Sequence, residues 1–166
     1  MQRRITLKDN IYLAIPFLIM FMLYTSSSMT YEAQTAVPTL EKILQGKPLY
    51  DFLSRFEFMY GDAVVSIAAD GYFSFVEFFI RKGAHFFTFF LLGFFWVLGL
   101  RKRVRDDWLT VLLAILLCIG YASFDEFRQS FNPGRSGMMA DVILDTAGAV
   151  VGTFLAQFLT YKKIIK

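Results

Sequence analysis

The most informative stretch of the chain is FFTFFLLGFFWVLGL, residues 86–100, an apolar run that only Thr88 and two glycines interrupt. Extended back to about Val76, it is long enough for a helix across the ~30 Å hydrocarbon core of a membrane, which takes about 20 residues. Comparable apolar stretches run from about Ile11 to Met29, from Trp108 to Phe127 and from Met138 to Leu159. We therefore predict an all-α integral membrane protein with four transmembrane helices.

The composition favours a membrane protein over a soluble one. Of the 166 residues, 56% are hydrophobic and 20 are Phe, and the mean hydropathy is +0.49. A soluble domain of this size fills its single core with fewer apolar residues. The net charge is only +3 and the basic residues are clustered, which is typical of membrane topology rather than of nucleic-acid binding. The single cysteine, Cys118, lies in an apolar run, so we expect a buried and inert thiol.

The basic residues predict the orientation of the chain. Ten of the 17 Lys and Arg residues fall on one side of the four predicted spans: Arg3, Arg4, Lys8, Arg101, Lys102, Arg103, Arg105, Lys162, Lys163 and Lys166. The positive-inside rule places that side, with both termini, in the cytoplasm. The first span follows basic residues as a signal peptide does. Its apolar part is long and its small-residue cleavage pattern is poor, so we expect it to remain as a membrane anchor.

The segment between the first two spans, residues 30–75, is too long for a simple turn and should lie outside the membrane. From Pro48 onward, its apolar residues follow helical spacing: Leu49, Phe52, Leu53, Phe56 and Tyr60. Asp51, Arg55 and Glu57 lie off that stripe. This pattern predicts an amphipathic helix that lies on the outer membrane face or caps the bundle.

Ionisable residues gather at the predicted outer ends of the last three spans. A charge at the centre of a membrane helix costs about 2.5–3.5 kcal/mol, so such residues are expected to pair and to face inward. Cations and carboxylates fall at matched depths on three helices, and Arg135 lies in the turn between the last two spans. The candidate ligand-binding residues are Arg81, Lys82, His85, Asp125, Glu126, Gln129, Arg135, Asp141 and Asp145.

This polar cluster has two interpretations. Its charges can pair simply to hold the bundle together, as buried ion pairs often do. With Arg128, eight charged residues lie at this end together with His85 and Gln129. This number exceeds what a small bundle needs for its own stability, so we predict an external pocket. Gly148 and Gly152 form a small-xxx-small pattern, which we interpret as helix packing only.

Three kinds of chemistry remain open for the pocket. His85 with Asp125, Glu126 or Asp145 could act as general base and orienter, while Arg81 or Arg135 holds an anionic head group. The cluster could instead bind a polar ligand without reacting with it, with hydroxyls from the serines at 26–28. A metal is the third possibility, but no HExxH-like pair or Cys/His set is present, so we expect neither metal nor cofactor.

The polar residues also carry a family resemblance. Arg81-Lys82-x-x-His85-Phe86, then Asp125-Glu126-x-x-Gln129-x-Phe131-x-Pro133-Gly134-Arg135, then Asp141 before Gly148, is similar to the signature of VanZ-like membrane proteins. The segment Ser26-Ser27-Ser28-Met29-Thr30-Tyr31-Glu32 resembles the end of the family's first span. The likeness covers most of the chain outside residues 40–70 and implies a single VanZ-like transmembrane domain over 1–166. Asp145 departs from the family, where Asn is frequent, so a role for this position transfers less directly.

The resemblance implies a multi-pass protein of the bacterial plasma membrane. The founding member is associated with low-level resistance to the lipoglycopeptide teicoplanin, without remodelling of the peptidoglycan precursor terminus. The first hypothesis is therefore an envelope protein whose pocket binds a lipid-linked or amphiphilic molecule, with membrane lipids as partners, and alters lipoglycopeptide susceptibility. The alternative is a membrane-embedded enzyme acting on a lipid or a lipid-linked sugar phosphate. A transporter is less expected, because residues 89–100 and 111–119 leave no polar path through the inner half.

Overall fold

The computed structural model describes residues 5–132 and 137–162 of the chain. Within them, four long helices are apolar enough to cross a membrane: α1 (Leu7–Ser27), α6 (Tyr72–Leu100), α7 (Asp107–Gln129) and α8 (Met139–Tyr161). No end differs from the predicted spans by more than four residues, so the structure contains the four long apolar helices that the sequence predicts.

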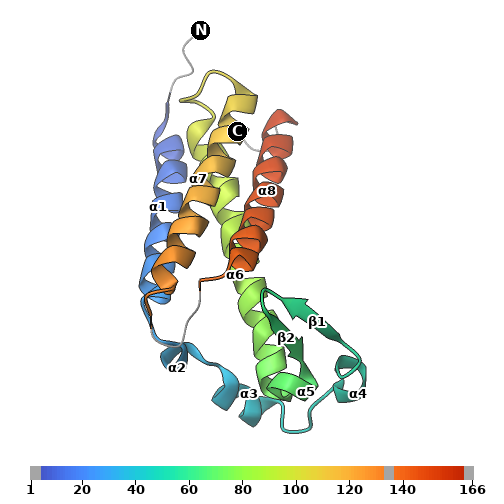
Figure 1. Ribbon diagram of the computed structural model, residues 1–166. Helices are drawn as coiled ribbons and strands as arrows, with labels where there is room; N and C mark the ends of the chain where they lie inside the picture. The colour runs from blue at the N-terminus through green and yellow to red at the C-terminus, as the bar shows by residue number, and fades with distance from the viewer. Residues whose placement is uncertain (1–4, 133–136, 163–166) are drawn as a thin grey trace.

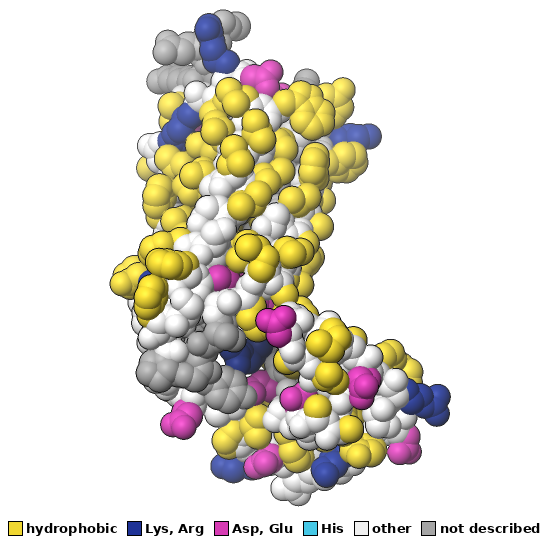
Figure 2. All heavy atoms as spheres, viewed as in Figure 1, with side chains coloured by type: hydrophobic (Ala, Val, Ile, Leu, Met, Phe, Trp, Pro, Cys, Tyr) yellow, Lys and Arg dark blue, Asp and Glu magenta, His cyan; other side chains and the backbone are white. Residues whose placement is uncertain are grey.

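The four helices form one bundle in which the start of α1 and the end of α8 lie at the same end (Figure 1). The most extensive helix contact joins α6 and α8, and α1 packs on α6 while α7 packs on α8. Phe89, Leu92 and Ala149 are fully buried in the core of this bundle, as is the predicted inert thiol of Cys118. The lateral faces expose large apolar side chains, as a lipid-facing surface requires (Figure 2).

Two glycines of α8 explain the close approach of α6 and α8. A Cβ atom at Gly148 would lie 2.2 Å from the carbonyl oxygen of Phe86, and one at Gly152 would lie 1.9 Å from that of Phe90. Both distances are shorter than any van der Waals contact, so a side chain at either position would force the two backbones apart. The predicted packing role of this glycine pair is confirmed.

Beyond the bundle, the chain forms a small subdomain against the first turns of α6 (Figure 1). Its elements are α2 (Tyr31–Gln34), α3 (Val37–Ile43), α4 (Tyr50–Leu53), β1 (Glu57–Tyr60), β2 (Ala63–Ser66) and α5 (Ile67–Asp70). We call residues 31–71 the hairpin subdomain, and the adjacent end of the bundle the hairpin end. With 29 residues, α6 is about 43 Å long, which exceeds the ~30 Å hydrocarbon core, so its first turns can carry this subdomain outside the membrane.

The predicted amphipathic helix from Pro48 is wrong beyond Leu53, where α4 ends. The chain instead forms an antiparallel hairpin in which Tyr60 pairs with Ala63 and Gly61-Asp62 is the two-residue loop. Gly61 has φ +60°, a value that tight hairpin turns require and that glycine adopts without strain. Leu49 and Phe52 of the apolar stripe are 71% and 54% exposed, whereas Leu53 and Tyr60 are partly buried against the core of this subdomain.

Candidate functional site

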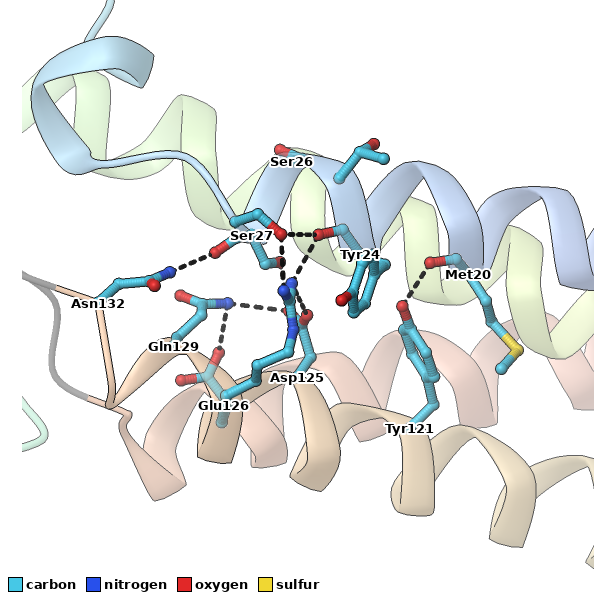
Figure 3. A network of polar contacts seen from close by, with 12 residues as sticks. Met20, Tyr24, Ser26, Ser27, Tyr121, Asp125, Glu126, Gln129 and Asn132 are labelled. Atoms are coloured by element: carbon cyan, nitrogen blue, oxygen red, sulfur yellow. Dashed lines mark hydrogen bonds and ion pairs between the residues drawn. The ribbon is translucent and has the colours of Figure 1, made fainter.

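Asp125 lies at the centre of a polar network between α1 and α7 at the hairpin end (Figure 3). Its side chain is buried, and its Oδ2 accepts hydrogen bonds from the hydroxyl of Ser27 at 2.8 Å and from the Nε2 of Gln129 at 2.9 Å. Gln129 reaches Asp125 because residues four apart on a helix lie one above the other. The predicted inward-facing position of these two residues is therefore confirmed.

Arg128 closes the same network on the surface of α1. Its guanidinium lies 3.9 Å from the ring centroid of Tyr24 and donates to the Tyr24 carbonyl oxygen and to the hydroxyl of Ser28, both at 2.6 Å. It also lies 3.8 Å from the Oδ1 of Asp125, as an ion pair rather than a hydrogen bond. Ser27 and Ser28 thus supply hydroxyls to the cluster, as partners of Asp125 and Arg128.

Glu126 joins the end of α7 to the beginning of α8. It is buried, its Oε2 accepts the backbone N–H of Met138 at 3.0 Å, and its Oε1 accepts a longer hydrogen bond from Gln129 at 3.4 Å. The predicted site residue Arg135 lies in the connection between these helices, outside the described residues.

Lys82 and Asp141 connect α6, α8 and the hairpin. Lys82 forms an ion pair with Asp141, and the hydroxyl of Tyr60 donates to the same carboxylate oxygen at 2.6 Å. The Nζ of Lys82 also lies 4.6 Å from the centroid of the Tyr60 ring, a cation–π contact. Burial and the adjacent Asp141 carboxylate raise the pKa of Tyr60 above its ordinary value, so the phenol stays protonated and able to donate.

His85 and Asp145 form a more loosely matched pair deeper in the bundle. The Nδ1 of His85 lies 3.6 Å from the Oδ2 of Asp145, which is too long for a hydrogen bond. Asp145 is fully buried, and among the described residues neither of its carboxylate oxygens has a hydrogen-bond partner. The pair is therefore an ionic contact only while His85 is protonated.

A cavity of about 320 Å³ lies between the hairpin and the hairpin end of the bundle. In Figure 2, charged side chains of both signs gather in the hollow between these two parts. The described lining residues are Tyr60, Ala63, Val64, Val65, Asp70, Ser74, Glu77, Phe78, Arg81, Lys82, Gln129, Met138 and Asp141. Four predicted site residues, Arg81, Lys82, Gln129 and Asp141, are thus brought together. The described lining does not include His85, Asp125, Glu126 or Asp145.

Three ionisable cavity residues, Tyr60, Asp70 and Glu77, were not predicted as site residues. Glu77 is only 2% exposed, and its Oε1 accepts hydrogen bonds from the hydroxyl of Thr35, at 2.9 Å, and from the backbone N–H of Ala36. It therefore fixes the chain entering α3 to the first turns of α6. Glu77 could have been found from the sequence, because it is the single carboxylate in the apolar run from residue 72 to 80.

A second polar cluster lies at the opposite end of the bundle. The buried carboxylate of Asp9 accepts from the backbone N–H of Thr6 at 2.7 Å and pairs with Lys102 at 2.9 Å. Arg103 donates to Asn10 at 2.5 Å. The basic residues after α6, interpreted from the sequence only as topology signals, therefore also bind α1 to the α6–α7 connection.

The described residues contain no group of three His, Cys, Asp or Glu side chains placed to hold a metal ion. The family model described as VanZ/LLP1 matches residues 10–160, which includes all four long helices and the hairpin. No curated protein and no solved structure matches the chain.

Proposed function

The chain belongs to the VanZ/LLP1 family, and we propose that it is a cell-envelope membrane protein whose cavity at the hairpin end binds the polar head of a lipid-linked or amphiphilic molecule. Through that binding it alters the susceptibility of the cell to lipoglycopeptides such as teicoplanin. The protein lies in the bacterial plasma membrane, with both termini in the cytoplasm and the cavity on the outer side.

The observation that carries this proposal is the mixed lining of the cavity. Arg81, Lys82 and Gln129 offer donors for a polar head, while Phe78 and Met138 offer an apolar surface. An amphiphile presents both kinds of group at one point of the membrane surface. If these charged residues served only to hold the helices together, they would be packed directly against one another, with no cavity between them.

The place of the cavity supports a role in access to the membrane surface. It lies where α6 leaves the bundle, between the outer ends of three helices and the hairpin. A molecule bound there occupies the level of the lipid head groups if the helices span the bilayer as their lengths indicate. Lipoglycopeptides carry an acyl chain and approach the cell from that side, so a change in head groups at this level alters their access.

The enzymatic alternative needs a general acid or base beside the bound ligand. His85, the single histidine of the chain, is not among the described lining residues and is instead directed to Asp145. Neither Ser27 nor Ser28 is among the described lining residues, so neither hydroxyl is placed beside a ligand in the cavity. Binding without reaction is therefore the function we propose.

The proposal is tested by the teicoplanin susceptibility of a sensitive Gram-positive host that expresses the chain. We expect the unmodified chain to raise the minimal inhibitory concentration and Arg81→Gln to abolish the increase, because the cavity loses its guanidinium. Arg55→Gln is the matched control, since Arg55 is an exposed arginine outside the cavity lining. Membrane protein levels are measured by immunoblot. An unchanged phenotype for Arg81→Gln at equal protein level would contradict the proposal.

A further inference from the structure

The charges in the cavity specify the head group more closely. We propose that it takes a zwitterionic phospholipid head group, with the phosphate against Arg81 and Lys82 and the ammonium against Asp70. This inference rests on the proposed function and adds the chemical class of the ligand.

The charges are ordered along the axis of α6. Asp70 lies just before the helix, Glu77 follows in its second turn, and Arg81 and Lys82 come one turn later. At ~1.5 Å per residue, Arg81 lies about 6 Å nearer the centre of the bundle than Glu77. All four residues line the same cavity. The cavity is therefore acidic at its outer end and basic at the end next to the membrane helices.

The two ends of the cavity also differ in how their charged residues are paired. Asp141 also lies at the basic end, but it is neutralised by its ion pair with Lys82 and accepts the Tyr60 hydroxyl. Arg81 is a second cation at the basic end and keeps its contact within the protein, while Asp70 and Glu77 are the carboxylates at the outer end. Over the described lining residues, the three carboxylates outnumber the two cations. A lipid pyrophosphate, which is strongly anionic, is disfavoured in such a cavity, because like charges in a partly dry site repel strongly.

A zwitterionic phospholipid matches this order. Its phosphate is attached to the glycerol and its ammonium lies at the far end of the head group. With the acyl chains in the bilayer, the phosphate is placed beside the cations next to the bundle, and the ammonium is placed toward the outer end. Apolar lining residues such as Phe78 and Met138 are available to the glycerol and the first methylene groups.

The individual side chains can make these contacts. Asp70 is exposed, and only its Oδ2 is used to accept the backbone N–H of Ser66, at 3.2 Å, so its other oxygen can meet an ammonium. Glu77 is buried and adds negative potential rather than a direct contact. Arg81 has five N–H donors, so it can keep its contact within the protein and still bind a phosphate.

The volume of the cavity sets an upper limit on the ligand. The volume of about 320 Å³ lies at the low end of the ~300–1,000 Å³ range of ligand sites. A phospholipid head group fits that space, whereas a whole lipoglycopeptide does not. The effect on lipoglycopeptides therefore runs through the lipid, without enclosure of the antibiotic in this cavity.

Binding of short-chain lipids to the purified full chain in detergent tests the inference. The probes are dihexanoyl phosphatidylethanolamine, dihexanoyl phosphatidylglycerol, farnesyl pyrophosphate and the soluble glycerophosphoethanolamine, measured by isothermal titration calorimetry. We expect the ethanolamine lipid to bind at least about tenfold more tightly than the glycerol lipid and the pyrophosphate, a difference of about 1.4 kcal/mol. It should also bind more tightly than the soluble head group, which has no acyl chains.

Matched variants assign the preference to the cavity. Asp70→Asn, which keeps an oxygen to accept from Ser66, should bring the ethanolamine lipid to the affinity of the glycerol lipid. Asp62→Asn, an exposed carboxylate at the hairpin loop outside the lining, should leave the preference intact. Arg81→Gln should weaken binding of both lipids, because both carry the phosphate.

The outcomes separate the inference from the proposed function. Tighter binding of the glycerol lipid, the pyrophosphate or the soluble head group, or an unchanged preference in Asp70→Asn, overturns the zwitterionic assignment. If that binding still depends on Arg81, the proposed function stands. If no probe binds to the folded protein in a way that depends on Arg81, the inference and the proposed function both fail.

Discussion

Asp125 shows how single residues keep charges inside this bundle. It is 1% exposed, yet Ser27 and Gln129 donate to it and Arg128 lies 3.8 Å away. These partners come from two helices, so the carboxylate holds α1 against α7. Removing one member of a buried network leaves the others without a partner and costs more than the network contributes.

Asp125→Ala is therefore expected to lower the free energy of unfolding by about 3 kcal/mol, the cost of breaking a buried charged network. Ser27→Ala, which removes one donor from the same carboxylate, should cost about 1 kcal/mol. Glu41→Ala, at an exposed position of α3, is the control and should stay within about 0.5 kcal/mol of the unmodified chain. The measurement is unfolding of the purified protein by titration with SDS. Equal stability of Asp125→Ala and Glu41→Ala would show that the network does not hold the helices.

For single residues, the sequence was sufficient to predict contacts between residues that are spaced along one helix face. The spacing of Asp125 and Gln129 placed them on one helix face, where they form a hydrogen bond. Cations and carboxylates were expected to pair across the helices, and Lys82 and Asp141 form such an ion pair. Tyr60 and Glu77 were missed because both contacts involve the hairpin subdomain, whose fold the four spans do not define. No local spacing rule connects such residues before the fold is known.

Among the elements, α6 and α8 define the architecture, because their backbones approach most closely. The contact depends on glycines, which have no Cβ atom. Gly148 and Gly152 face the carbonyl oxygens of Phe86 and Phe90, and Gly93 faces that of Ala149. In a membrane, where burial of apolar surface gives little drive for association, such close packing supplies much of the contact energy between helices.

Gly152→Ala should therefore separate α6 from α8 and destabilise the protein by about 1–3 kcal/mol, the usual cost of overpacking. Gly120→Ala is the matched control, since a Cβ atom there would meet no heavy atom within 4 Å. The control should be neutral or slightly stabilising, because alanine is the better helix former. Thermal unfolding of both variants in detergent gives the comparison. A melting temperature for Gly152→Ala equal to that of Gly120→Ala would refute the close contact.

The hairpin marks where prediction from sequence failed at the scale of elements. Apolar residues between Leu49 and Tyr60 fit a helical period, and this was given more weight than the Gly61-Asp62 pair that follows. A glycine with positive φ in a two-residue loop is a hairpin signal, and it outweighs a short periodic run. The four spans were easier to predict, because about 20 apolar residues in a row have few other uses.

For the whole molecule, the arrangement of helices implies one orientation. The start of α1, the α6–α7 connection and the end of α8 lie together at one end, and the hairpin subdomain lies at the other (Figure 1). The basic residues concentrate at the first of these ends, which the positive-inside rule assigns to the cytoplasm. With the proposed orientation, the cavity would face the outside of the cell.

Labelling of introduced cysteines with a membrane-impermeant maleimide tests that orientation. In intact cells, Asp62→Cys at the hairpin loop should be labelled, whereas Arg105→Cys before α7 should be labelled only after permeabilisation. The native Cys118 is buried and should give little background in the unmodified chain, which serves as the control. Labelling of Arg105→Cys in intact cells, with Asp62→Cys protected, would reverse the orientation and place the cavity in the cytoplasm.

The central claim is that the cavity between the hairpin and the bundle holds a lipid head group. The most direct measurement is an experimental structure of the full chain purified with lipid from native membranes. We expect density for a phosphate-bearing head group in contact with Arg81, with its acyl chains directed along the bundle. A cavity filled by side chains of the protein, or one without lipid density while lipids are resolved on the helix faces, would contradict it.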